Sequence, residues 1–468
     1  MAAKLSPWLI YALLPLLAGC ASLSPEEPFG DVANSVEERT GRQIQWGIYG
    51  NPGPEVRSAT TAMLAQPLTP SRAVQVALLN NKTLHAEYTR LGIGQAELVQ
   101  ATLPPNPIAA GKVTFADDGA TNLVFGGALQ VIELLRIPLK RRVAKSQLEE
   151  AKIEVAARVL GVVAEVQTAF IDYQAAEHMR AYLQGVVETE RAAETAAAGL
   201  RQAGNITALD YERQNGELVA AKLELARTET RVIGAREKLD VLMGLATPQT
   251  HWRAPPRLPG VPARELRVKG AEEAALAASL ELAGARQKLF TLAQKYNLTK
   301  AQAAAPGGTA GGEWEQDTGE EEAGPVFEAT LPVFDWGQAR KARARMEIKR
   351  ARDQHEALVV RVRAAARAAR DGLLAARKTA LYNRSTALPQ AARLMRAAQR
   401  QYNAMQIGVF ELIRAKRDHM RTSQQEIDAL AQYWVARVRF YQLMIGTLPN
   451  ETGRGGPRLA GGGEAEDN

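Results

Sequence analysis

Apolar residues recur at helical spacing from residue 69 onward. Thr69 suits an N-cap with Pro70 at the first helical position, and Pro104 and Pro105 stop the pattern after Leu103. One apolar stripe is formed between them by Ala73, Val76, Ala77, Leu84, Leu91 and Leu98. The pattern therefore predicts a helix over residues 69–103.

Two short segments of strand character follow this helix. They cover residues 108–116 and 122–132, and the turn-forming residues Asp117, Asp118 and Gly119 separate them. We therefore expect a β-hairpin at this point of the chain.

A much longer helical pattern begins after Pro138 and continues without proline to about Ala203. A helix of about 65 residues would extend nearly 100 Å at 1.5 Å per residue, which no compact domain contains. Gly204 and Asn205 then break the pattern, and a second run from Thr207 to Met243 ends at Gly244. Residues 247–262, with five prolines, have the character of a linker.

The same order of elements recurs in the second half. We expect a helix over 266–296, strands over 297–304 and 325–334 around a loop rich in Gly and Glu, a rod over 338–404, a break at Gly408, and a helix ending near Ile445. Pro138 to Asp210 is 72 residues and Pro332 to Glu411 is 79, a difference of seven. One heptad leaves a coiled-coil face unchanged, so we interpret the two halves as an internal repeat.

The first residues indicate export from the cytoplasm. Lys4 precedes an apolar stretch from Trp8 to Leu17 that is too short to span a bilayer core, which needs roughly 20 residues. The run from Leu17 to Cys20 resembles the lipobox of bacterial lipoproteins, and Cys20 is the only cysteine. The resemblance implies a lipid on Cys20, and Ala21 after it favours the outer membrane. The alternative is an incidental cysteine behind an ordinary signal peptide.

These patterns give a predicted domain organisation. It consists of a signal peptide (1–19), a lipid-anchored and irregular extension (20–66), a first repeat (67–250), a linker (251–265), a second repeat (266–448) and a flexible tail (449–468).

Composition and charge narrow the classes of function. The chain is 6% aromatic and 23% charged with a net charge of +7, and it has no dense basic patch interleaved with aromatic residues, so nucleic acid is a poor partner. Its five histidines are scattered, and no pair has the i, i+4 spacing of a metal site. We expect no catalytic residue, no metal and no cofactor, and therefore no enzyme.

Several motifs resemble the TolC-like outer-membrane factors, the exit ducts of tripartite efflux systems. The first half carries LTPSRAVQVALLNNKTLHAEYTRLGIGQAELVQATLPPNPI and RQAGNITALDYERQ, and the second carries ATLPVFDWGQARKARA and YNAMQIGVFELIRAKRD. The resemblance covers nearly all of residues 67–448. It implies a mainly α fold with a small β part: a homotrimer with a long coiled-coil helical tube across the periplasm and a 12-stranded outer-membrane β-barrel, four strands per chain. Physics agrees, because four strands are too few to close a barrel and an open sheet edge in lipid leaves backbone groups unsatisfied.

The breaks between the rods form the periplasmic tip in this arrangement. The resemblance implies that the tip contacts a periplasmic adaptor protein and opens with it, beside an inner-membrane pump. The candidates for docking and gating are Gly204, Asn205, Thr207 and Asp210 in the first half and Gly408 and Glu411 in the second. Helix capping alone explains the same residues.

The function that we expect is an outer-membrane channel that exports small molecules or metal ions. The outlet of a type I protein secretion system is an alternative with the same fold. An alternative of a different class is a periplasmic, lipid-anchored coiled-coil adaptor or scaffold.

Overall fold

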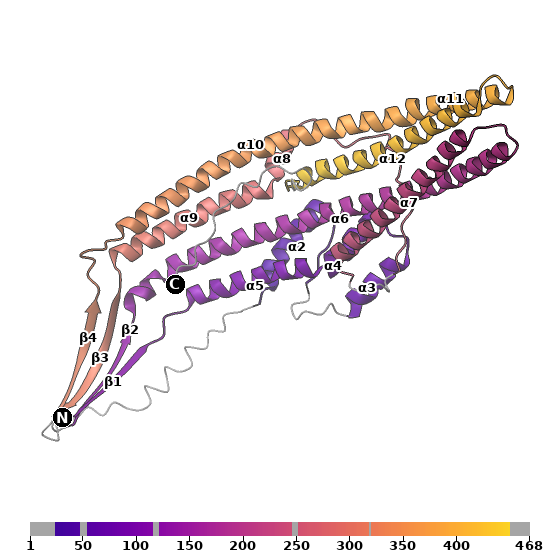
Figure 1. The fold of residues 1–468 in the computed structure, drawn as a ribbon. Helices are drawn as coiled ribbons and strands as arrows, with labels where there is room; N and C mark the ends of the chain where they lie inside the picture. The colour runs from indigo at the N-terminus through magenta and orange to yellow at the C-terminus, as the bar shows by residue number, and fades with distance from the viewer. Residues whose placement is uncertain (1–23, 47–53, 116–120, 246–250, 318–319, 450–468) are drawn as a thin grey trace. The chain divides into compact units, whose positions relative to one another are not determined.

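The computed structural model describes residues 24–46, 54–115, 121–245, 251–317 and 320–449 (Figure 1). The chain divides into two compact units. The first comprises Met1–Val159, Lys238–Ala254 and Leu280–Arg361, and the second comprises Leu160–Glu237, Pro255–Ser279 and Val362–Asn468. The signal peptide, Cys20 and the tail after residue 449 lie outside the described residues.

The helix expected over 69–103 is two helices, α4 (Pro70–Asn80) and α5 (Lys82–Thr102). Thr69 caps α4 as expected, and its side chain accepts a hydrogen bond from the Arg72 amide. Asn81 interrupts the pattern because its backbone is extended and its side chain caps α5. The side-chain amides of Asn80 and Asn81 also donate hydrogen bonds to the backbone carbonyls of Gly244 and Leu242, where another helix of the chain ends. The asparagine pair therefore joins two segments of the first unit.

The sequence predicts an irregular segment before residue 66, but the structure shows two helices there. It contains α2 (Glu26–Thr40) and α3 (Pro54–Ala65). Helix α2 buries Pro28, Val32 and Val36, and Lys152 forms an ion pair with Asp31 at 2.7 Å. The prediction was wrong because Pro and Gly residues separate the short apolar runs of this segment. Its helical pattern of apolar residues is weak by itself and is stabilised by packing in the folded unit.

The first hairpin lies where the sequence predicts it. Strands β1 (Ile108–Phe115) and β2 (Thr121–Leu129) pair antiparallel. The second strand ends before residue 132 because helix α6 (Val131–Gln202) begins there, about two turns before Pro138 rather than after it. Pro138 therefore lies inside α6, where its nitrogen has no hydrogen to donate to the Leu134 carbonyl.

The second hairpin lies elsewhere than expected. Residues 297–304 belong to helix α9 (Leu280–Ala304). The expected loop forms β3 (Gly308–Asp317) and the first half of β4 (Glu320–Ala329), so the strand expected over 325–334 is confirmed only over 325–329. Gly and Glu have low strand propensity, so local preference gave the wrong assignment. Pairing of β3 with β2 supplies what local preference lacks, and the four strands form one sheet in the order β1-β2-β3-β4.

Most of the remaining helices are long. Helix α6 has 72 residues, and α7 (Ala208–Met243) follows it. The second half has α8 (Ala271–Ala278), α9, α10 (Gln338–Tyr382), α11 (Leu388–Asn403) and α12 (Val409–Ile445). A short π-helical segment, η2 (Asn383–Ala387), joins α10 to α11. Pro389, near the start of α11, lacks the amide that a regular helix would use there, which accounts for the widened turn.

Each unit has its own core. In the first unit the largest fully buried side chains include Leu68, Leu78, Leu84, Tyr88 and Leu91. In the second, apolar side chains of α6, α10 and α12 pack around Tyr433, Leu373 and Phe440. The segment after Pro255 is fastened to this core: Gln174 donates to the carbonyls of Pro255 and Arg257 at 3.0 Å each, and Trp434 donates to that of Pro259 at 2.8 Å.

Candidate functional site

The sheet of the first unit has one apolar face. Residues directly opposite each other in an antiparallel pair point to the same face, so the register assigns each side chain to a face. One face carries Val113, Phe115, Leu123, Phe125, Leu129, Trp314, Pro325 and Phe327, and its polar residues Thr121, Gln316 and Glu321 lie at the end of the sheet where the hairpins turn. Phe125 and Trp314 stack with their ring centroids 6.2 Å apart. Phe115 is 78% exposed and Phe327 76%, so this face is not covered within the chain.

The opposite face of the sheet is acidic. It carries Glu313, Glu315, Asp317, Glu320, Glu322 and Glu328, with Lys112 as its basic residue. Glu315 lies directly opposite Glu322, and Asp317 lies opposite Glu320. Like charges in such pairs are destabilising unless water solvates them. One face thus suits a hydrocarbon environment and the other requires water.

The sheet is also open at both sides. Strand β1 pairs only with β2 and β4 only with β3, so each outer strand leaves a row of backbone groups without a partner within the described sheet. Such edges invite pairing with another strand.

The second unit has two turns that connect helices, and the first of them lies between α6 and α7. Gly204 has a φ of 74°, and the amide of Asn205 donates to the Leu200 carbonyl at 2.8 Å, which closes the end of α6. The Thr207 hydroxyl oxygen then accepts from the Asp210 amide at 3.1 Å and caps α7. Capping is therefore a role that these residues hold within the chain.

The second turn lies between α11 and α12. Gly408 is not the residue with left-handed backbone: its φ is −77°, and it occupies the N-cap of α12 without a capping side chain. The left-handed residue is Met405, with a φ of 57° and a side chain that is 95% exposed. Glu411 lies in the first turn of α12, where its amide donates to the Gly408 carbonyl at 3.2 Å.

The two turns border one cavity of about 430 Å³. Of the six candidate residues, Asp210 lines it, whereas Gly204, Asn205, Thr207, Gly408 and Glu411 do not. Its other walls are mostly apolar and include Leu200, Ile206, Val409, Phe410 and Ile413. Sequence reasoning missed these apolar side chains because it searched for the break residues; each lies within a few residues of a break.

Polar contacts hold the first turn and its helices together. Tyr211 donates to the Glu194 carboxylate at 2.9 Å, which raises the pKa of Tyr211. Deeper between α6 and α7, the amide of Gln214 donates to Glu190 at 2.8 Å, and both side chains are buried. These contacts hold α7 against α6, so the first turn is positioned by both helices.

Two other kinds of feature are absent from the described residues. No group of three or more His, Cys, Asp and Glu side chains is arranged to hold a metal ion there. None of the described helices combines the length and the apolar character needed to cross a membrane.

Comparison with known proteins identifies the fold. No protein-family profile matches the sequence, and no curated protein matches it. A solved membrane protein from Pseudomonas aeruginosa superposes with a TM-score of 0.70 at 20% identity, over 81% of this chain and 91% of that one. The CmeC outer membrane channel of Campylobacter jejuni gives a TM-score of 0.71 at 13% identity, over 82% of this chain and 87% of that one. The open MtrE outer membrane channel of Neisseria gonorrhoeae gives 0.66 at 16%, over 81% and 89%.

The chain therefore has the fold of the outer-membrane channels, as the TolC-like resemblance implies. It is mostly helical with one small antiparallel sheet.

Proposed function

We propose that this protein is the outer-membrane exit duct of a tripartite efflux system for small molecules or metal ions. The observation that carries the proposal is the sheet, with one apolar face, one acidic face and two unpaired edges. In a membrane barrel the apolar side chains face lipid and the polar ones face the water-filled lumen. The likeness to solved outer-membrane channels supports the same reading.

Closure of the barrel supports a homotrimer. A lipid-exposed sheet cannot leave an edge unpaired, because the hydrocarbon contains no water to satisfy its backbone groups. Edge β4 of one copy would pair with edge β1 of the next, and three copies would supply about twelve strands, an even number within the range of known barrels. The long helices would then form the periplasmic tube.

The first and second turns support a role in docking an adaptor. Their shared cavity is lined by apolar side chains from both hairpins, and a partly exposed apolar hollow at the end of a helical bundle suits the helices of a partner. We propose that a periplasmic adaptor binds there, that Asp210 and Glu411 contribute to docking or gating, and that an inner-membrane pump completes the system.

The proposal also includes a lipid anchor on Cys20. Replacing Cys20 with Ala would remove the thiol that carries the lipid, so metabolic labelling with a radioactive fatty acid should no longer mark the protein. Label that persists on the variant would refute the anchor and leave the duct proposal unaffected.

Electron microscopy of the detergent-extracted protein tests the duct. We expect a threefold particle with a narrow tube, and the variant Phe125→Lys, which puts a charge on the apolar face, should lose it; a lysine near the bilayer midplane costs about 2–4 kcal/mol. Lys112→Phe on the acidic face is the matched control for a changed strand residue. A wild-type monomer without a barrel would refute the proposal.

A further inference from the structure

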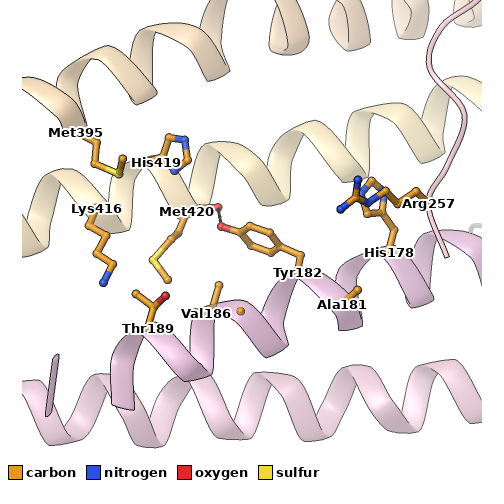
Figure 2. Close-up of a pocket in the computed structure, with 11 residues that line it drawn as sticks. His178, Ala181, Tyr182, Val186, Thr189, Arg257, Met395, Lys416, His419 and Met420 are labelled. Atoms are coloured by element: carbon orange, nitrogen blue, oxygen red, sulfur yellow. Dashed lines mark hydrogen bonds between the residues drawn. The ribbon is translucent and has the colours of Figure 1, made fainter. Parts of the chain in front are cut away.

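A second cavity of the second unit, of about 520 Å³, lies farther from the turns (Figure 2). It is bordered by α6, α11, α12 and the segment that carries Arg257. Its volume falls within the range of small-molecule sites, roughly 300–1,000 Å³.

The permanently charged side chains that line this cavity are of one sign. They are Arg257 and Lys416, and none of the lining residues is Asp or Glu. Neither Arg257 nor Lys416 takes part in any ion pair among the described residues. Their neighbours behave differently: Arg417 pairs with Glu217 at 2.9 Å, and Arg437 pairs with Glu265 at 3.2 Å.

One end of the cavity brings His178 and Arg257 together (Figure 2). The Nδ1 atom of His178 is buried and has no hydrogen-bond partner. Burial lowers the pKa of His178, and the nearby charge of Arg257 lowers it further. The backbone of Arg257 is fixed by the Gln174 amide at 3.0 Å. A guanidinium on an anchored segment, in a cavity without a lining carboxylate, is an arrangement that an anion would complete.

The wall between the two ends is apolar and adaptable. Val186, Met395 and Met420 line it, and methionine conforms to ligands of different shape. The Tyr182 hydroxyl is already engaged, because it donates to the Met420 carbonyl at 2.9 Å. A cation is a poor occupant of such a cavity, since two unpaired positive charges and no carboxylate surround it.

We propose that this cavity binds a small organic anion that has an apolar body. Arg257 holds its carboxylate or sulfonate group beside the His178 ring, and the body lies against Val186, Met395 and Met420. The site takes walls from α6 and from α12, which belong to different hairpins. Ligand binding therefore stabilises the arrangement in which these helices are adjacent against any arrangement in which they separate.

Calorimetric titration of the full-length protein in a neutral maltoside detergent tests the proposal, with 2-naphthalenesulfonate as the probe and detergent alone as the blank. We expect saturable binding, a Kd at least tenfold weaker for Arg257→Gln, and an unchanged Kd for Arg264→Gln. Arg264 is an exposed residue of the same segment outside the cavity, so it is a matched control. Neutral 2-naphthalenemethanol should bind far more weakly than the sulfonate.

A second variant protects the test against misfolding of Arg257→Gln. Gly185 lines the cavity from within α6, and a Cβ atom there would meet nothing within 4 Å, so Gly185→Met fills the space and keeps every charge. We expect it to abolish binding with an unchanged circular dichroism spectrum. No saturable binding by the wild type, equal affinity for the neutral analogue, or an unchanged Kd in Arg257→Gln or Gly185→Met would overturn the proposal. The measurement needs no channel activity, so its failure would leave the duct proposal standing.

Discussion

The two turns of the second unit follow the same backbone path, but they differ in the residues at the positive-φ position and at the N-cap. Gly204 and Met405 both have left-handed backbone, and the amides of Asn205 and Gln406 close equivalent bonds to the carbonyls five residues earlier, at 2.8 and 2.9 Å. The first turn has glycine where φ is positive and threonine at the N-cap. The second has methionine at the first position and Gly408 at the cap. The comparison shows that backbone path can be kept while local stabilisation is lost, so the second turn should open more readily than the first.

The largest expected effect comes from removing the glycine of the first turn. Gly204→Val forces a β-branched residue into the left-handed region, which should destabilise the turn by about 2 kcal/mol. Hydrogen exchange of the Asn205 amide, read by mass spectrometry, should accelerate accordingly. Gly216→Val is the control for side-chain bulk, because Gly216 lies inside α7 with open space around it and should not accelerate exchange. Equal effects at both positions would remove the backbone explanation.

Loss of the cap is the next largest change. Thr207→Ala removes the oxygen that accepts from the Asp210 amide, which should cost about 1 kcal/mol of helix stability at the start of α7. The Asp210 amide should then exchange faster, whereas Thr207→Ser should keep the wild-type rate. A wild-type rate in Thr207→Ala would mean that the hydroxyl contributes nothing to the turn.

Relief of strain in the second turn should be smaller and of opposite sign. Met405→Gly removes the left-handed strain but adds freedom to the unfolded chain, so the net gain should be about 0.5 kcal/mol. Exchange of the Gln406 amide should slow. Met405→Asn should lie between the two, because asparagine tolerates positive φ better than methionine. Faster exchange in Met405→Gly would show that the exposed methionine stabilises the turn by packing.

The smallest expected effect is a new cap. Gly408→Ser supplies the missing side-chain acceptor at the start of α12, and serine exceeds glycine at this position by only a few tenths of a kcal/mol, roughly 0.3. The Glu411 amide should exchange slightly more slowly, and Gly408→Ala should not reproduce the gain. With both Met405→Gly and Gly408→Ser, the second turn should approach the first in exchange rate.

The long helices and the first turn could be predicted because their signals are local. Thr69 with Pro70, Gly204 and Thr207 each act on atoms within a few residues, and the structure uses them as capping rules predict. Met405 could not be found this way, because no propensity places methionine at positive φ. Alignment of the two turns residue by residue would have placed it opposite Gly204.

The second hairpin could not be predicted because its stabilisation is not local. Strand β3 is rich in Gly and Glu, and a Cβ at Gly311 would lie 2.0 Å from the Gly127 carbonyl oxygen, so glycine there permits the close approach of β2. This requirement is visible only once β2 is in place. One signal was present: Glu313, Glu315 and Asp317 alternate with Trp314 and Gln316, which is the two-residue period of a strand with two different faces.

In the proposed trimeric barrel, the two open edges of the sheet would make the rate of assembly depend on how often copies meet. A chain that needs two further copies to pair its edges would assemble slowly at low surface density, so insertion should rise steeply with the number of copies per area of membrane. A lipid on Cys20 would confine the chains to two dimensions and shorten their search for one another. In that case the anchor acts before transport begins, by setting how quickly a cell can install new ducts.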